Sequence, residues 1–467
     1  MKRFALAVAV ISLAGCTVGP NYQRPKVDTP AAFRGPDSTP AAAGAESLGD
    51  AKWFTVFRDP ELRKLIRTAL DRNYDLQIAA TRVLEARSQV TIVRASQFPV
   101  VNGQALVTGE RTPVISGGFP SFSYAAIEAA LSVSWDADFW GKYRRATQAA
   151  RASLMASDWA RKAVTASLVA NVATAYFQLC ELDLQLEISK RTLAAREDSL
   201  KLTTTLVDGG AASLIDQRQA EQLVETASAS IPDLERQIQQ DENQIGILLG
   251  ENIGENPAPL PRGLALTDQP LPAEVPPGIP SRLLARRPDI LEAEQNLIAA
   301  NANIGVARAA FFPDISLTAL AGVESTSLTT LFRGPSRTWT WTGQATQPIF
   351  EAGKIRANLR LAQQQRQEML LTYRQTIQTA FSEVSNALIA YRKYRETREH
   401  QERLVTAAES AADLSRLRYQ GGAASYLEVL TNDTNAFAAE LNLAAARLGE
   451  NTAFVQIYNS LGGGWDQ

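Results

Sequence analysis

One pentapeptide occurs twice in this chain of 467 residues. Gly209-Gly210-Ala211-Ala212-Ser213 returns 212 positions later as Gly421-Gly422-Ala423-Ala424-Ser425, and the same offset relates Gly141-Lys142 to Gly353-Lys354. A lone five-residue match between common residues can arise by chance, but here the surroundings repeat as well. Further pairs are Asp216 with Glu428 at that offset, and Asp75 with Asp289 and Phe98-Pro99 with Phe312-Pro313 at an offset of 214. The chain is an internal duplication whose halves should fold alike.

Each copy of the pentapeptide interrupts a long helical pattern. Adjacent glycines accept positive φ angles, so a helix ending at Asp208 or Gln420 can reverse its direction there. Ser213 and Ser425 then stand where a side chain would cap the next helix. The repeats therefore predict two helical hairpins with matching tips.

Proline is spread unevenly. Eight of the 22 prolines lie between Pro257 and Pro280, whereas only Pro232 falls between residues 121 and 256, and none follows Pro348. Two long stretches are thus free to be helical, with a kink expected at Pro232, and a Pro-rich connector separates the halves. With 21% charged residues and a net charge of -2, the chain lacks the excess of basic residues that is typical of nucleic-acid binding. We therefore expect no nucleic-acid partner.

The N-terminus reads as a targeting signal. Lys2 and Arg3 precede an apolar run from Phe4 to Leu13 that is too short to span a bilayer, and Leu13-Ala14-Gly15-Cys16 follows. This stretch resembles a bacterial lipoprotein signal, which implies cleavage before Cys16, acylation of Cys16 and delivery to the outer membrane. A plain secretory peptide with an incidental cysteine is the alternative.

Alternation with a period of two marks strands. From Ala125 to Phe139 every odd position is apolar, while even positions are small or polar, and residues 315–323 and 338–346 alternate similarly. Residues 101–109 do so less cleanly. Each half therefore carries one hairpin, whose loops at about 111–122 and 325–337 contain the expected turn glycines and prolines.

These four strands are long enough to cross a bilayer when tilted. A soluble sandwich packed on the helices is the alternative, but the lipoprotein signal and the aromatic residues near the strand ends favour a membrane. Four strands cannot close a barrel, and open edges in lipid cost several kcal/mol per unpaired group. Several chains must therefore pool strands; two copies would give a filled barrel of about eight, and three a barrel of about twelve with a lumen. The polar face favours three.

Two helical stretches of about 65 residues follow the strands, from Gly141 and from Gly353. At 1.5 Å per residue each would be roughly 100 Å long. One apolar stripe has the mixed spacing of a coiled-coil seam and consists of Val164, Leu168, Val172, Ala175, Leu179, Leu182 and Leu186. A solvated coiled-coil spacer is the alternative; it fits the helices but leaves the strands unexplained.

Several motifs resemble those of the outer-membrane efflux proteins, the TolC-like channels, in particular their NodT-type lipoprotein branch. The motifs are Trp135-Asp136-Ala137-Asp138-Phe139-Trp140-Gly141-Lys142, Arg286-Arg287-Pro288-Asp289-Ile290, Phe311-Phe312-Pro313, Gln347-Pro348-Ile349-Phe350 and Leu461-Gly462-Gly463-Gly464-Trp465. The resemblance covers essentially the whole chain. It implies a mainly α fold with a membrane β-barrel: a homotrimer with a 12-stranded barrel in outer-membrane lipid and a periplasmic tube of long helical hairpins. It also implies two partners, a periplasmic adaptor (membrane fusion) protein and an inner-membrane pump of the RND type.

The resemblance gives the turns a role. It places the tips at the periplasmic end, as gate and adaptor-docking surface; the docking candidates are Asp208, Gly209, Gly210, Ser213, Gln420, Gly421, Gly422 and Ser425. Asp216 and Glu428 would face the narrowed pore, while Arg218, Arg418 and Tyr419 would hold neighbouring helices together. Solvated carboxylates at helix starts are the alternative for both acids. Family members often carry a second aspartate where this chain has Thr431, so a doubled acidic ring is in doubt.

From the sequence we expect six segments along the chain. They are a signal peptide (1–15), an arm leading from the anchor (16–61), a first repeat (62–256) with a β-hairpin at 98–140 and a helical hairpin at 142–250, a connector (257–280), a second repeat (281–461) with a β-hairpin at 312–350 and a helical hairpin at 353–460, and a tail (462–467).

No enzymatic constellation is evident. The one histidine, His400, lies in a charged helical run, and no nucleotide loop, cofactor motif or clustered metal ligands occur, so we expect no enzyme, cofactor or metal. Three methionines in all argue weakly against a copper or silver conduit. Three functions are considered: a passive duct of an efflux pump for drugs or other small toxic molecules, a duct for protein secretion, and a non-conducting coiled-coil envelope scaffold. Lipidation and the NodT-like motifs favour the first.

Overall fold

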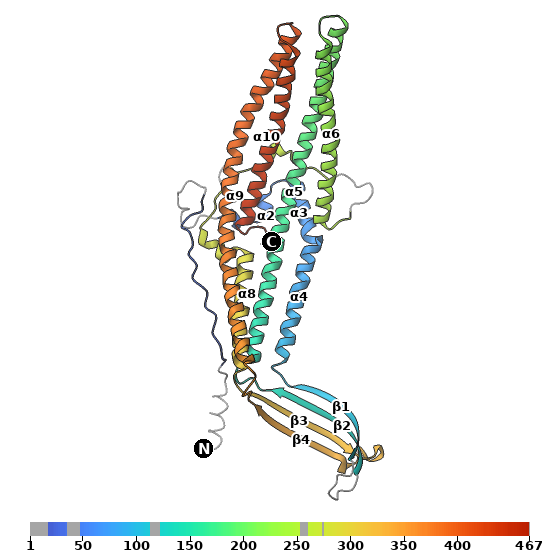
Figure 1. The fold of residues 1–467 in the computed structure, drawn as a ribbon, viewed down its shortest axis with the longest axis vertical. Helices are drawn as coiled ribbons and strands as arrows, with labels where there is room; N and C mark the ends of the chain where they lie inside the picture. Colours follow the sequence, from blue (N-terminus) through green and yellow to red (C-terminus); the bar gives the residue numbers. More distant parts are fainter. Residues whose placement is uncertain (1–16, 35–46, 113–121, 253–259, 273–274, 467) are drawn as a thin grey trace. The chain divides into compact units, whose positions relative to one another are not determined.

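The structure is a computed structural model that describes residues 17–34, 47–112, 122–252, 260–272 and 275–466 (Figure 1). The predicted signal peptide, Cys16 and the loop residues 113–121 lie outside them. The main elements are α3 (Pro60–Arg72), α4 (Tyr74–Ala95), β1 (Val100–Thr112), β2 (Phe122–Asp136), α5 (Lys142–Asp208), α6 (Leu214–Leu249), α8 (Pro288–Ala309), β3 (Asp314–Ser325), β4 (Arg337–Thr346), α9 (Lys354–Gln420) and α10 (Tyr426–Ser460). Short helices are η1 (Leu48–Asp50), α2 (Trp53–Val56), η2 (Leu266–Asp268), η3 (Pro280–Arg282), α7 (Leu283–Arg286), η4 (Leu328–Thr330) and η5 (Gly334–Ser336).

The chain forms two compact units, and each draws on both repeats. The first comprises Met1–Lys26, Arg82–Asp158 and Glu292–Arg374 and contains the strands. The second comprises Val27–Thr81, Trp159–Leu291 and Gln375–Gln467 and contains most of the helical hairpins. Like parts of the two halves thus pack together, rather than each half folding by itself.

All four strands form one antiparallel sheet in the order β1-β2-β3-β4 (Figure 1). The register places odd-numbered residues opposite odd-numbered ones throughout, as in the row Val101, Val133, Ala319 and Trp341. Because side chains alternate between faces, most apolar residues of the four strands share one face and most serines, threonines and glutamates share the other, although Leu106 and Leu320 lie on the polar face. The alternation seen in the sequence is therefore a property of the whole sheet.

Strand β2 ends earlier than its alternating pattern suggests. The pattern continues to Phe139, but the strand stops at Asp136, and Asp138 caps the next helix, α5, which begins at Lys142. The Asp138 carboxylate accepts hydrogen bonds from the backbone N–H groups of Tyr143 (3.1 Å) and Arg144 (2.9 Å), which lie in the first turn of α5. Capping these otherwise unpaired donors turns the chain out of the sheet.

Two helical hairpins make up most of the second unit, α5 with α6 and α9 with α10 (Figure 1). Helices α5 and α9 have 67 residues each, which at 1.5 Å per residue corresponds to roughly 100 Å. Helix α6 runs through Pro232 without interruption. In the predicted seam of α5, the five residues from Leu168 to Leu182 are buried, and the outer two, Val164 and Leu186, are half-buried.

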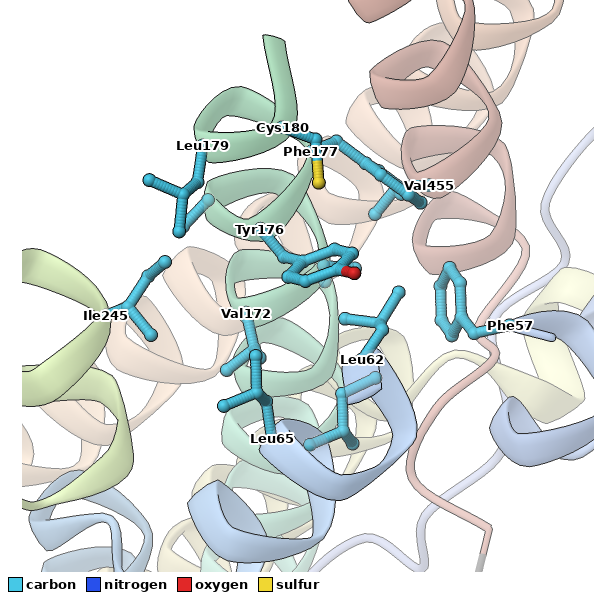
Figure 2. Close-up of a cluster of buried hydrophobic side chains, with 14 of the residues drawn as sticks. Phe57, Leu62, Leu65, Val172, Tyr176, Phe177, Leu179, Cys180, Ile245 and Val455 are labelled. Atoms are coloured by element: carbon cyan, nitrogen blue, oxygen red, sulfur yellow. The ribbon is translucent and has the colours of Figure 1, made fainter. Parts of the chain in front are cut away.

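Figure 2 shows the largest apolar core, in which α3, α5, α6 and α10 meet. Leu62 of α3, Val172 and Leu179 of α5 and Ile245 of α6 are almost completely buried there. Cys180 also lies in this core, and burial raises the pKa of its thiol to about 12. It is a packed side chain rather than a reactive thiol.

A buried carboxylate organises the same region. Asp59 caps α3 through the N–H groups of Glu61 (2.9 Å) and Leu62 (3.3 Å), and it accepts a hydrogen bond from the Tyr176 hydroxyl (2.7 Å). Burial alone would raise the pKa of Asp59, but these hydrogen bonds and those from Gln269 and the Leu264 N–H outweigh it, so the pKa is lowered. Asp59 therefore remains charged and joins α3, α5 and the connector.

Candidate gate and docking tip

The two tips share one backbone structure. Gly210 and Gly422 have φ angles of +73° and +68°. In each tip the residue after this glycine donates its N–H to a carbonyl five positions back, Ala211 to Leu206 (2.7 Å) and Ala423 to Arg418 (2.8 Å). This is a Schellman helix end, which requires a left-handed residue and so favours glycine. The predicted docking residues from Asp208 to Gly210 and from Gln420 to Gly422 are all exposed.

The helices that leave the tips begin differently. Ser213 and Asp216 form a capping box: the Ser213 hydroxyl accepts from the Asp216 N–H (3.3 Å), and the Asp216 carboxylate accepts from the Ser213 N–H (3.1 Å). Ser425 occupies the same position before α10, but its side chain makes no capping hydrogen bond. The cap expected from the sequence is thus present at Ser213 and absent at Ser425.

The counterpart of Asp216 is engaged elsewhere. Glu428 forms an ion pair of 2.8 Å with Arg418, which joins the end of α9 to the start of α10. Arg418 also donates to the Ala423 carbonyl at 3.4 Å. Arg218, by contrast, pairs with Glu221 (2.6 Å) on its own helix. Of the arginines predicted to join helices, Arg418 does so within the described chain.

Tyr419 lies where the two hairpins meet. Its ring contacts the buried Tyr426 ring edge-on at 5.1 Å, and both pack with Leu200, Ala220 and Val429. Burial and then the Asp216 carboxylate raise the pKa of Tyr419. The structure therefore brings Asp216 and Tyr419 together at the boundary between the hairpins.

Behind the tips lies a charged cluster that sequence reasoning missed. Arg196 of α5 is 3% exposed; it donates to the Leu223 carbonyl of α6 (2.9 Å) and lies 5.0 Å from the Phe437 ring of α10. Asp433 of α10 is also buried and pairs with Arg416 of α9 at 2.8 Å. All four helices are thereby linked.

Heptad spacing could have revealed this cluster. Ser189, Arg196 and Thr203 are seven residues apart on α5, and all three are buried. Asp433 follows Tyr426 by seven residues on the buried side of α10. A polar residue at a seam position is a specific feature of a coiled coil and can be recognised from its spacing.

The residues directly after Cys16 are docked on the first unit. Arg145 of α5, 4% exposed, donates to the carbonyls of Val18 and Gly19 (both 3.3 Å) and to Asn21 Oδ1 (2.9 Å). Gly19 packs so closely on Gly305 that a side chain at either position would collide with its neighbours. The start of the predicted arm is therefore part of the fold.

One described helix is long and apolar enough to cross a membrane by length and composition. It is α5, and 67% of the apolar window is buried inside the protein. A buried core helix passes the same test, so this is weak evidence for a helical span.

The whole chain has close counterparts among known proteins. The family "Outer membrane efflux protein" matches residues 65–251 and 279–463. The toluene efflux pump outer membrane protein TtgC of Pseudomonas putida is 39% identical over 99% of this chain and 95% of its own length. The cation efflux system protein CusC of Escherichia coli is 34% identical over 98% and 97%. The crystal structure of the open state of the Neisseria gonorrhoeae MtrE outer membrane channel covers 96% of this chain and 99% of its own, with 32% identity and a TM-score of 0.86.

Two matched repeats, four strands and long helical hairpins define a channel protein of the outer membrane. The chain belongs to the outer membrane efflux protein family and is the outer-membrane channel component of an efflux pump. The resemblance inferred from the motifs is confirmed, and so are the fold class and the expectation that this is not an enzyme.

Proposed function

We propose that three copies of this chain form a continuous exit duct. Their sheets would pool into a 12-stranded barrel in the outer membrane, and their helical hairpins would form a tube through the periplasm. Cys16 would carry the lipid anchor. The tips would meet a periplasmic adaptor and, through it, an inner-membrane pump of the RND type.

The sheet is the observation that carries this proposal. It has one apolar face, and within the described chain β1 and β4 each have one neighbour only. A sheet in lipid must pair every backbone group, which an isolated four-stranded sheet cannot do. Closure by other copies supplies the missing partners, and twelve strands leave room for a lumen along the polar face.

We assign the gate to the tip residues. The Arg418–Glu428 pair holds α9 against α10, and Tyr419 holds the α9–α10 hairpin against α6 near Asp216. Opening would require these contacts to loosen. The tip residues 208–213 and 420–425, exposed except for the half-buried Ala212 and Ala424, would supply the docking surface for the adaptor.

The cargo we propose is small organic molecules such as antibiotics or aromatic solvents. TtgC, the relative named for toluene efflux, shares more identity with this chain than CusC, which is named for cation efflux. A duct selects little by itself, so the pump would determine the cargo.

Two experiments test the duct. Deleting the gene should increase sensitivity to antibiotics and toluene, and a plasmid copy should restore tolerance; unchanged drug accumulation in the deletion strain contradicts the proposal. Purified protein in planar bilayers should conduct ions, whereas a scaffold would pass no current. Growth of the deletion strain on copper or silver is the control for the cargo. A duct for cations predicts that this strain is sensitive to these metals instead of to antibiotics and toluene.

The anchor is tested separately. Radiolabelled palmitate should be incorporated into the full chain and not into a Cys16→Ser variant. Equal labelling of both would contradict acylation at Cys16.

A further inference from the structure

The second compact unit contains a cavity that is separate from the tips. It lies where α8 begins and α10 ends, and Arg287, the residue before α8, joins these two ends by donating to the carbonyl of Ser460 at 3.0 Å. Residues of α5 and α9 complete the walls, and the volume is about 590 Å³. A cavity of this size can hold a small organic molecule.

Small side chains keep this space open. Protein interiors are otherwise close-packed, with few voids larger than a water molecule. Five alanines face the cavity from three helices, and they are Ala163 and Ala166 of α5, Ala387 and Ala390 of α9, and Ala453 of α10. Three of the five, one on each helix, are buried. The inner wall is therefore apolar and flat.

The duplication shows that the helical hairpin does not require these alanines. Helices α5 and α9 have 67 residues each and begin 212 positions apart, so their residues can be compared one by one. Three of the alanines correspond to glutamines, in the pairs Ala163 with Gln375, Ala166 with Gln378, and Ala390 with Gln178. Larger side chains thus occur at the equivalent places, and the open wall is particular to this junction.

The charged side of the cavity is acidic. Arg287 donates to both carboxylate oxygens of Asp289 (3.0 and 2.7 Å) and to Glu383 (2.6 Å). One guanidinium against two carboxylates leaves an excess of one negative charge. The Arg287 side chain is 9% exposed, whereas those of Asp289 and Glu383 are 38% and 47% exposed. A ligand in the cavity therefore meets the carboxylates first, which favours a cation.

An aromatic ring and two amides stand at the mouth of the cavity. Tyr394 of α9 is 43% exposed, and its ring lies over Gly449 of α10, where an added Cβ would be 2.4 Å from the ring. Such a ring can stack on an aromatic ligand or attract a cation to its face. Asn386 and Gln456 add hydrogen-bonding groups beside it.

We propose that this cavity binds small organic monocations. The apolar or aromatic body of the ligand lies on the alanine wall, and its charged nitrogen lies beside Glu383 and Asp289. The proposal rests on the proposed efflux function and adds a class of cargo, amine-bearing organic molecules, for which the channel itself carries a site. Cargo of this class is held longer than anionic cargo of the same size.

Dye binding to the purified full chain tests the proposal. Rhodamine 6G, an aromatic monocation, is titrated in detergent, and its fluorescence anisotropy is compared with that in empty micelles. We expect saturable binding, and binding of the anionic dye 8-anilinonaphthalene-1-sulfonate roughly tenfold weaker. Lack of saturable rhodamine 6G binding, or equal affinity for the two dyes, would overturn the proposal.

Variants assign the binding to this cavity. Glu383→Gln should weaken rhodamine 6G binding roughly three- to tenfold. Ala390→Gln, which introduces the residue found at the equivalent place on α5, should abolish binding because it fills the space. Glu368→Gln and Ala407→Gln, at exposed sites on α9, are the matched controls and should bind as the wild-type chain does. If Ala390→Gln does not fold, Ala163→Gln fills the cavity from α5. Unchanged affinity in Glu383→Gln or in a folded cavity-filling variant would overturn the site.

Conductance in planar bilayers separates the two possible failures. A protein that conducts ions but does not bind rhodamine 6G refutes this site and leaves the proposed duct intact. A protein that binds the dye but passes no current refutes the proposed function, and with it the role of the site in export.

Discussion

At the scale of single residues, equivalent positions of the two repeats have different roles. Asp216 completes a capping box with Ser213, whereas Glu428 leaves Ser425 uncapped and pairs with Arg418. A carboxylate at a helix start can serve either purpose, and the longer glutamate side chain reaches an arginine across the turn. The two acidic positions should therefore respond differently to substitution.

Replacing Glu428 by Gln should favour opening of the tip. The exposed pair with Arg418 is worth about 0.2–1 kcal/mol, so the open probability in planar bilayers should rise by a factor of roughly 1.4 to 5. Glu225→Gln, at an exposed site on α6, is the control and should not change it. An equal rise in open probability in both variants would show that Glu428 is not part of the gate.

Another buried carboxylate, Asp241 of α6, predicts a pH dependence. It is 6% exposed, its Oδ2 has no hydrogen-bond partner among the described residues, and burial raises its pKa to about 6. Nearby Arg262 opposes the shift, while Glu242 and Asp183 add to it. A raised folded-state pKa means that the stabilising contribution is complete below the ordinary pKa and is lost as pH rises through about 6.

Asp241→Asn should therefore stabilise the protein at pH 7.5, by roughly 1–3 kcal/mol, and by clearly less at pH 4.5. Thermal unfolding at the two pH values measures the difference. Asp233→Asn on the same helix is the control. Hydrogen bonding to Arg236 lowers the pKa of Asp233, so removing this carboxylate should not stabilise the protein at pH 7.5. A pH-independent gain from Asp241→Asn would contradict the assignment.

At the scale of elements, the tips depend on one backbone angle each. Nothing lies within 4 Å of a Cβ added at Gly210 or Gly422, so the left-handed φ and not crowding requires glycine there. The preceding glycines, Gly209 and Gly421, do not have positive φ angles. Adjacent glycines with the same surroundings in the sequence thus differ in what they contribute.

Gly210→Ala and Gly422→Ala should each destabilise the local turn by about 1 kcal/mol, because a left-handed alanine is strained. Hydrogen exchange of the tip amides should then accelerate about fivefold. Gly209→Ala and Gly421→Ala are the matched controls and should change exchange little. If exchange accelerates equally in the two variants of one tip, the left-handed φ angle is not what requires glycine there.

At the scale of the whole molecule, the apolar face of the sheet is the surface that we propose to contact lipid. Trp339 and Trp341 are 73% and 72% exposed on its apolar face, opposite the small residues Ala321 and Ala319. Tryptophan side chains are enriched at the boundary between lipid and water. The apolar face should therefore be the lipid-facing one.

Brominated lipids test this orientation through tryptophan fluorescence. In vesicles, the Trp339→Phe/Trp341→Phe variant should lose most of the quenchable emission, although five of the seven tryptophans remain. Trp53→Phe removes a core tryptophan and should leave the quenchable part unchanged. Undiminished quenching in the double variant would show that this face is not in contact with lipid.

The sequence by itself determined the repeat, the class of each long element and the position of the turns. Those features depend on local spacing: a period of two over Ala125–Asp136, seven-residue seams along α5, and paired glycines that permit a reversal. The tertiary structure decided the end of β2 at Asp136, the unequal caps at Ser213 and Ser425, and the buried Arg196 and Asp433. Each of these depends on which donor and acceptor lie within hydrogen-bonding distance. Spacing can mark Arg196 and Asp433 as seam positions, but it does not identify their partners on other helices.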